Sequence, residues 1–151
     1  MDFDAILMKS FGDLPFGASE QETESVLGIP EEKEQLEAID GSVSVIWHYW
    51  SKGFTVFFDR MENGRFCCAE VDSSVRLNMW GQNLFSLNEN EIKSLFKENG
   101  FNELDEEQHE WGEKRISFDD AMADFYFENG ILVSINFGVM SENLNQSIYP
   151  N

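Results

Sequence analysis

The chain has 151 residues, of which 42% are hydrophobic and 14% aromatic, and its net charge is −19 at pH 7. The apolar content predicts a folded protein, and no run approaches the length of a transmembrane helix. Acidic residues are spread over both halves, which disfavours direct contact with nucleic acid or anionic lipid. Such a surface would attract a basic partner, or it could serve solubility alone.

The first 15 residues predict a short amphipathic lead-in. Phe3, Ile6, Leu7 and Phe11 lie near helical spacing, and Pro15 ends the segment. Residues 1–4 lack the basic region of a signal peptide, so we expect a cytoplasmic location.

A capping box marks the first clear helix. Ser19 can cap the backbone N–H of Glu22, and the Glu22 carboxylate can reach back to Ser19. The helix should end at Leu27, because Gly28 follows it. Residues 31–41 are rich in Glu and predict a connector with at most one further helical turn.

Strand candidates follow at 43–50, 54–59 and 65–71, with a fourth at 75–80. Ser51-Lys52-Gly53 and Asn63-Gly64 separate the first three strands and are typical of hairpin turns. The first strand places Val45, Trp47 and Tyr49 on one face. The opposite face carries Ile46, His48 and Trp50, joined by Phe57 from the next strand.

The second half follows the same order. Asn88 and Glu91 predict a helix cap, and Asn99-Gly100 ends that helix. An acidic connector leads to strands at 114–119, 123–128 and 131–137, the last two joined by Asn129-Gly130. Alternation predicts one buried face, made of Phe125, Phe127, Ile131, Val133, Ile135 and Phe137. The other face should carry Asp124, Tyr126, Ser134 and Asn136.

The two halves align at one constant offset. Phe16, Ser19, Glu20, Glu22, Val26 and Leu27 recur as Phe85, Asn88, Glu89, Glu91, Leu95 and Phe96. This agreement predicts a duplicated unit. We therefore expect one α+β domain over 1–151, with repeats at 14–80 and 81–140 and a polar tail at 141–151. Each repeat would be a helix plus an antiparallel meander, and the sheets would form one curved face with the helices behind.

Aromatic residues outside the predicted core are candidates for a partner-binding surface. Trp50, Phe57, Trp80 and Tyr126 would anchor a protein partner, together with His48. Glu106, Glu107 and Glu110 would steer a basic partner toward them. The alternative is that Trp50, Phe57 and Trp80 fill the seam between the repeats.

No motif predicts catalysis, a metal or a cofactor. His48 has no predicted partner acid and is interpreted as a packed histidine. Glu106 and His109 have Glu-x-x-His spacing, but only one such motif is present, so a solvated charge run is the preferred interpretation. The adjacent Cys67 and Cys68 predict reduced thiols. We expect a protein that is not an enzyme.

Several segments resemble small bacterial proteins with a tandem helix-plus-sheet repeat, whose architecture is similar to the β-lactamase-inhibitor-protein-like fold. These segments are Leu14-Pro15-Phe16-Gly17-Ala18-Ser19, Val26-Leu27-Gly28-Ile29-Pro30, Trp80-Gly81-Gln82-Asn83-Leu84-Phe85 and the Phe-Tyr-Phe-Glu-Asn-Gly hairpin at 125–130. The resemblance implies binding of a partner protein on the open sheet face and its edge loops. Many small acidic bacterial proteins of this kind are immunity proteins.

The leading hypothesis is therefore a cytoplasmic immunity or inhibitor protein that neutralises a bacterial toxin, with a basic toxin or effector domain as its partner. One alternative is a small-ligand or lipid-binding module that uses an aromatic pocket. Another is an acidic mimic of nucleic acid.

Overall fold

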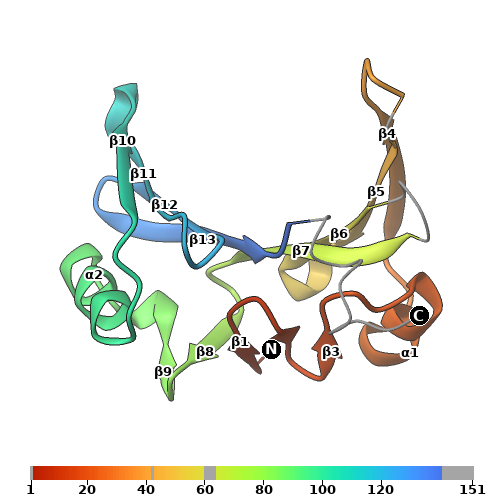
Figure 1. Ribbon diagram of the computed structural model, residues 1–151, viewed down its shortest axis with the longest axis horizontal. Helices are drawn as coiled ribbons and strands as arrows, with labels where there is room; N and C mark the ends of the chain where they lie inside the picture. Colours follow the sequence, from red (N-terminus) through yellow and green to blue (C-terminus); the bar gives the residue numbers. More distant parts are fainter. Residues whose placement is uncertain (1, 42, 60–63, 141–151) are drawn as a thin grey trace.

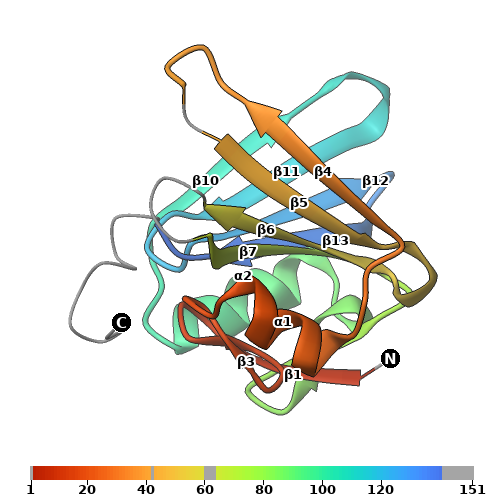
Figure 2. The ribbon, with the colours of Figure 1, turned by 90° about the vertical axis from the view of Figure 1, so that its right-hand side faces the viewer.

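The protein is an α+β structure in which two helices lie against one face of a large antiparallel sheet (Figures 1 and 2). The computed structural model describes residues 2–41, 43–59 and 64–140. The predicted turn residue Asn63 and the predicted tail at 141–151 lie outside the described residues. Within those ranges, neither helix has the length and apolar content needed to cross a membrane.

The large sheet has eight strands in the order β10-β11-β12-β13-β7-β6-β5-β4, and every neighbouring pair is antiparallel. Its strands are β4 (Glu32–Glu37), β5 (Val43–Tyr49), β6 (Phe54–Asp59), β7 (Arg65–Asp72), β10 (Leu104–Gln108), β11 (Glu113–Phe118), β12 (Ala123–Glu128) and β13 (Ile131–Gly138). Both ends of the sheet bend away from the helices, so the uncovered face is concave (Figure 1).

The two helices begin as the sequence predicts. Helix α1 (Glu20–Leu27) has the capping box of Ser19 and Glu22, and α2 (Glu89–Glu98) has that of Asn88 and Glu91. Each box satisfies two backbone N–H groups at the helix start. Three short 3-10 helices are also present, η1 (Trp50–Lys52), η2 (Leu84–Ser86) and η3 (Glu110–Gly112).

A second, smaller sheet lies on the same side as the helices, in the order β3-β2-β1-β8-β9. Its strands are β1 (Asp2–Ile6), β2 (Ser10–Phe11), β3 (Leu14–Pro15), β8 (Arg76–Met79) and β9 (Gln82–Asn83). The prediction of a helix-like lead-in at 1–15 is wrong. Met8 and Gly12 both have φ of 61°, which reverses the chain after each short strand. The predicted strand at 75–80 exists as β8, but it pairs in parallel with β1 and lies outside the large sheet.

The edge strands β4 and β10 correct the two segments predicted as connectors. Except for Leu104 on β10, their core-facing positions are polar, so apolar alternation does not reveal them. On β4, the Lys33 ammonium lies 4.4 Å from the ring centre of Trp47. On β10, the Glu106 carboxylate binds Lys93 of α2 at 2.7 Å. Both edges are therefore attached to the core by charged side chains.

A β-bulge changes the predicted faces of β13. Tyr126 pairs with Ser134, but Phe127 pairs with Leu132, so Val133 is an extra residue in the ladder. Leu132 is buried and Ile131 is 68% exposed, in place of the predicted burial of Ile131 and Val133. Phe125, Phe127, Ile135 and Phe137 are buried as predicted.

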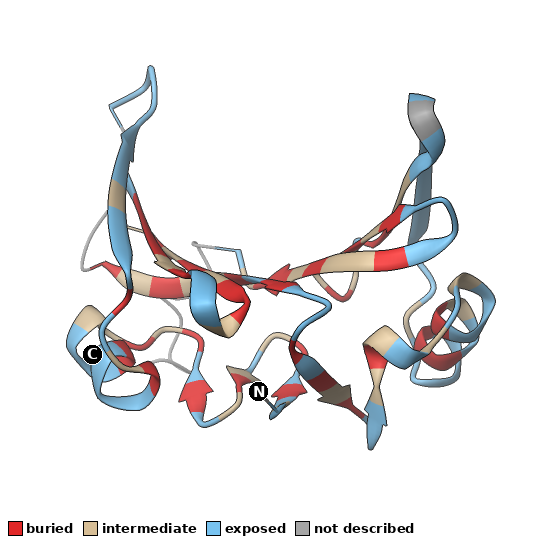
Figure 3. Ribbon diagram, turned by 180° about the vertical axis from the view of Figure 1, so that it is seen from behind, coloured by how far each residue is buried: buried red, intermediate tan, exposed pale blue. Residues whose placement is uncertain are grey.

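One continuous core fills the space between the large sheet, the helices and the small sheet (Figure 3). Val45, Trp47 and Tyr49 of β5 face it, as the alternation predicts. Strands β7 and β13 join the two halves of the sheet directly. Phe137 of β13 packs its ring 5.8 Å from both Phe11 and Phe16, so the core also crosses that junction.

Candidate functional site

The concave face is crossed by a row of polar side chains, one from each strand of the large sheet. In register from β4 to β10, the row is Glu32, His48, Thr55, Glu70, Asn136, Asp124, Ser117 and Asp105. An antiparallel sheet that faces water on one side normally has polar residues there. Four of these eight residues are carboxylates, so the row is strongly acidic.

A cavity of about 380 Å³ opens on this face over β5, β6 and β7. Trp50 and Phe57 form aromatic parts of its wall, and Glu34, Glu70 and Asp72 add three carboxylates. The Trp50 side chain is 58% exposed because it follows the last residue of β5 and begins η1. The cavity therefore combines an accessible indole ring with negative charge.

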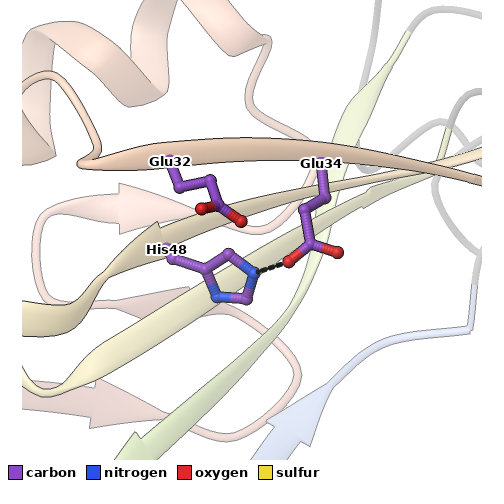
Figure 4. Close-up of side chains that lie close together, drawn as sticks. All are labelled: Glu32, Glu34 and His48. Carbon is purple, nitrogen blue, oxygen red and sulfur yellow. Dashed lines mark hydrogen bonds and ion pairs between the residues drawn. The ribbon is translucent and has the colours of Figure 1, made fainter.

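His48 is held in this cavity by three neighbours, of which Figure 4 shows Glu34. Its Nε2 lies 2.6 Å from Glu34 Oε1, its Nδ1 lies 3.1 Å from Thr55 Oγ1, and its ring stacks on Trp50 at 4.9 Å between centroids. The partner acid that the sequence did not predict is thus Glu34, on the neighbouring strand. Glu32 lies directly opposite His48 in the ladder. Ligand atoms of Glu32, Glu34 and His48 all lie within 4.8 Å of one another, so they could hold a metal ion.

A second hollow of about 290 Å³ lies over β11, β12 and β13 and contains Tyr126, His109 and Lys114. Ser134 lines both hollows, so they are neighbours on one face. Burial, followed by the nearby charge of Asp124, raises the pKa of Tyr126, and this phenol stays protonated at neutral pH.

Arg115, near the second hollow, is paired with two carboxylates. Arg115 donates to Glu107 at 2.8 Å and to Asp105 at 3.0 Å, and these bonds raise the pKa of the guanidinium. Arg115 also donates to Ser117, whose hydroxyl donates to Asp124 at 2.5 Å. Glu113 and Glu128 line the same hollow and are exposed, so this end of the concave face also keeps negative charge.

The carboxylates of the first cavity are less compensated. Within the ranges that the structure describes, the Glu70 side chain makes no hydrogen bond or ion pair, and the residue is exposed. Asp72 accepts hydrogen bonds from the backbone and hydroxyl of Ser74 in its own turn. Uncompensated negative charge on the concave face thus includes Glu70, which lines the same cavity as Trp50 and His48.

The structure brings some of the predicted partner-binding residues together and separates others. Trp50, Phe57 and His48 line the first cavity, and Tyr126 lines its neighbour. Trp80 lies elsewhere, 5.1 Å from the ring of Phe96 in α2. Glu106 also faces α2, whereas Glu107 binds Arg115 on the concave face. Glu110 is exposed in η3.

Sequence analysis missed Glu34, Thr55, Glu70 and Asp72 as residues of the cavity. Glu32 and Glu34 have the alternating spacing of a strand, which was the available signal. It becomes useful only once residues 32–37 are known to pair with β5. The other three depend on the register of β6 and β7, which no local pattern specifies.

The two cysteines are free thiols, as predicted. Burial raises the pKa of Cys67 to about 11 and that of Cys68 to about 12. Thiols with such pKa values are poor nucleophiles at neutral pH, because the thiolate is the reactive form.

No family model, curated protein or solved structure matches this chain.

Proposed function

We propose that this chain is an immunity or inhibitor protein that binds a basic bacterial toxin domain on the concave face of its large sheet, without chemistry of its own. The observation that carries the proposal is the first cavity, where the exposed ring of Trp50 lies beside the uncompensated carboxylate of Glu70. Exposed aromatic anchors ringed by charge are typical of protein interfaces. The proposed location is the cytoplasm.

We also propose that the architecture is a tandem duplication of the β-lactamase-inhibitor-protein-like kind. In its support, a capped helix precedes four antiparallel strands twice, α1 before β4–β7 and α2 before β10–β13. The two halves meet at the β7–β13 pair. In such an arrangement, the uncovered face is continuous across both repeats.

The division of roles follows from the position of the charges. Glu70 and Asp72 would speed the approach of a basic domain, because complementary charge raises the association rate. Trp50 would be buried on binding and would act mainly on the dissociation rate. The paired charges around Arg115 would contribute less, because they are already compensated.

The test requires a toxin domain, sought first among the products of neighbouring genes, which is purified and also co-expressed for a growth-rescue assay. Trp50→Ala should weaken binding by about 2–4 kcal/mol, largely through faster release, and should reduce rescue. Glu70→Lys should slow association several-fold at low salt and much less at high salt. Surface plasmon resonance at two salt concentrations separates the two effects.

Matched controls are Trp80→Ala and Glu98→Lys, which change the same residue types on the side of α2. Both variants should bind like the wild type. Loss of binding in the controls, with Trp50→Ala unaffected, would place the interface on the helix side and contradict the proposal.

A ligand pocket is the second candidate, because the first cavity has the volume of a small-molecule site. Its three carboxylates disfavour a lipid or an anionic ligand and leave a cationic small molecule as the suitable class. Thermal-shift screening against organic cations in the absence of any protein partner would distinguish this candidate from a toxin inhibitor.

A further inference from the structure

We propose that His48, Glu32 and Glu34 form a binding site for a divalent transition-metal ion of the Zn²⁺ type. The three ligand atoms lie within 4.8 Å of one another and come from two neighbouring strands (Figure 4). An ion held by one imidazole nitrogen and two carboxylate oxygens has ligand distances of about 2.0–2.2 Å. Rotations of the two Glu side chains, which lie at the edge of the sheet, can bring the oxygens to that distance.

The strands place these three groups without strain. Glu32 and Glu34 are two residues apart on β4, so both side chains point to the same face. His48 is the direct neighbour of Glu32 across the ladder, and it hydrogen-bonds to Glu34 along the diagonal. The backbone therefore fixes all three positions before any ion binds.

The imidazole is oriented from outside the cluster. Thr55 Oγ1 lies 3.1 Å from Nδ1 and can accept a hydrogen bond from an Nδ1–H group. In that tautomer Nε2 carries no proton, and its lone pair can bind a metal in place of the hydrogen bond to Glu34. The ring of Trp50 stacks on the imidazole with an interplanar angle of 17° and limits its rotation. Histidines that bind metals commonly have such a hydrogen bond on the other ring nitrogen.

The surroundings favour a cation and a transition metal over Mg²⁺ or Ca²⁺. Glu70 and Asp72 line the same cavity and add negative charge close to the ion. Because Mg²⁺ and Ca²⁺ take oxygen ligands, replacing one oxygen by an imidazole nitrogen shifts the preference toward Zn²⁺, Ni²⁺ and Cu²⁺. Three protein ligands leave coordination positions open toward the cavity for water or a side chain of a partner.

The chain offers a matched comparison in its second histidine. His109 Nε2 lies 3.4 Å from Glu107 Oε1, so it too is paired with a glutamate. Among the described residues, however, the Glu32, Glu34 and His48 group is the one with three possible ligands close together. His109 therefore tests whether a histidine beside an acid is sufficient on this acidic surface.

Isothermal titration calorimetry of the chelator-treated full chain with ZnCl₂ and MgCl₂ tests the site. The wild type should bind one Zn²⁺ and show no comparable heat with Mg²⁺. His48→Gln and Glu34→Gln should each abolish this binding, and His109→Gln should leave it unchanged. Thr55→Val, which removes the positioning hydroxyl, should weaken Zn²⁺ binding by about tenfold or more.

Thermal melting of each metal-free variant checks that the fold is retained, and Glu34→Gln provides a second variant at a partly exposed position if His48→Gln is unstable. Equal Zn²⁺ affinity in the wild type and in a folded His48→Gln or Glu34→Gln variant would overturn the proposal, as would absence of Zn²⁺ binding to the wild type. If His109→Gln lost Zn²⁺ binding to the same extent as His48→Gln, the proposal would also be overturned. Such a result would show that Zn²⁺ binds diffusely to surface acids. None of these results depends on the proposed toxin partner.

Discussion

At the scale of single residues, the position of an aromatic side chain in or beyond a strand decides its role. Trp47 and Trp50 are three positions apart, yet Trp47 is 1% exposed and Trp50 is 58% exposed. Trp47 packs its ring 4.7 Å from that of Phe58 in the core, whereas Trp50 stacks on His48 at the surface. One tryptophan therefore contributes to stability and the other is available for a partner.

Alanine substitutions should separate these two roles. Trp47→Ala should lower the free energy of unfolding by about 3–5 kcal/mol, because it leaves a large cavity in the core. Trp50→Ala should lower it by less than about 1 kcal/mol, since the ring is largely exposed. Urea denaturation of both variants measures the difference. A similar loss in the two would show that Trp50 is a core residue and would remove it from the candidate interface.

At the scale of elements, α2 is attached to the edge of the sheet by a cluster of four charged side chains. Glu89 and Glu106 each bind both Lys93 and Lys114, at distances from 2.7 to 3.1 Å. Hydrogen bonds from Lys93 and Lys114 lower the pKa of Glu106. Burial raises the pKa of Glu89, but the bonds from Lys114 and Lys93 outweigh it, so that pKa is also lowered.

This cluster predicts a specific loss of stability in acid. A carboxyl group whose pKa is lowered by folding stabilises the protein above its unfolded pKa of about 4.3, and this contribution disappears as the pH falls through the folded pKa. Glu106→Gln should therefore lower the free energy of unfolding by less than about 1 kcal/mol at pH 7. At pH 3 it should leave the free energy of unfolding unchanged. Urea denaturation between pH 3 and pH 7 measures this difference.

The control for this experiment is Glu110→Gln, which removes one negative charge at an exposed position of η3. Within the described residues, Glu110 forms no ion pair. The free energy of unfolding of Glu106→Gln could instead differ from that of the wild type by the same amount at every pH. That result would show that the ionised Glu106 carboxylate does not stabilise the fold.

The elements also show which parts of the fold were predictable. Both capping boxes and the central strands follow local rules, and the Asn129-Gly130 turn has the positive φ values that its residues favour. Strands β4 and β10 were missed because Lys33 and Glu106 occupy core-facing positions. The candidate site depends on register: Glu34 reaches His48 only through the β4–β5 pairing, which sequence periodicity does not specify.

At the scale of the whole molecule, the two halves share one core and one close backbone contact. Gly138 of β13 pairs with Cys68 of β7, and a side chain at Gly138 would overlap the carbonyl oxygen of Cys67. Because that obstacle is backbone, it cannot move aside without opening the β7–β13 pair. A glycine is therefore required where the halves meet.

Gly138→Ala should lower the free energy of unfolding by about 1–3 kcal/mol, because it overpacks this junction. Ser134→Ala, at another position of the same strand pair, should change it by less than about 0.5 kcal/mol. Both variants and the wild type should unfold in a single transition by calorimetry and by fluorescence, since the core is continuous. Two separate transitions in the wild type would contradict one cooperative unit.

The charged edge strands have a consequence for assembly. Because β4 and β10 are opposite edges of the same sheet, pairing β10 of one copy with β4 of the next would be a head-to-tail contact that need not close into a ring. Such contacts can extend into filaments, and uncovered strand edges are the usual starting point. Here Glu32, Glu34 and Glu37 on one edge would approach Asp105, Glu106 and Glu107 on the other. Negative side chains at both edges disfavour that contact, and we expect the wide sheet to stay uncovered on one face without extending into filaments.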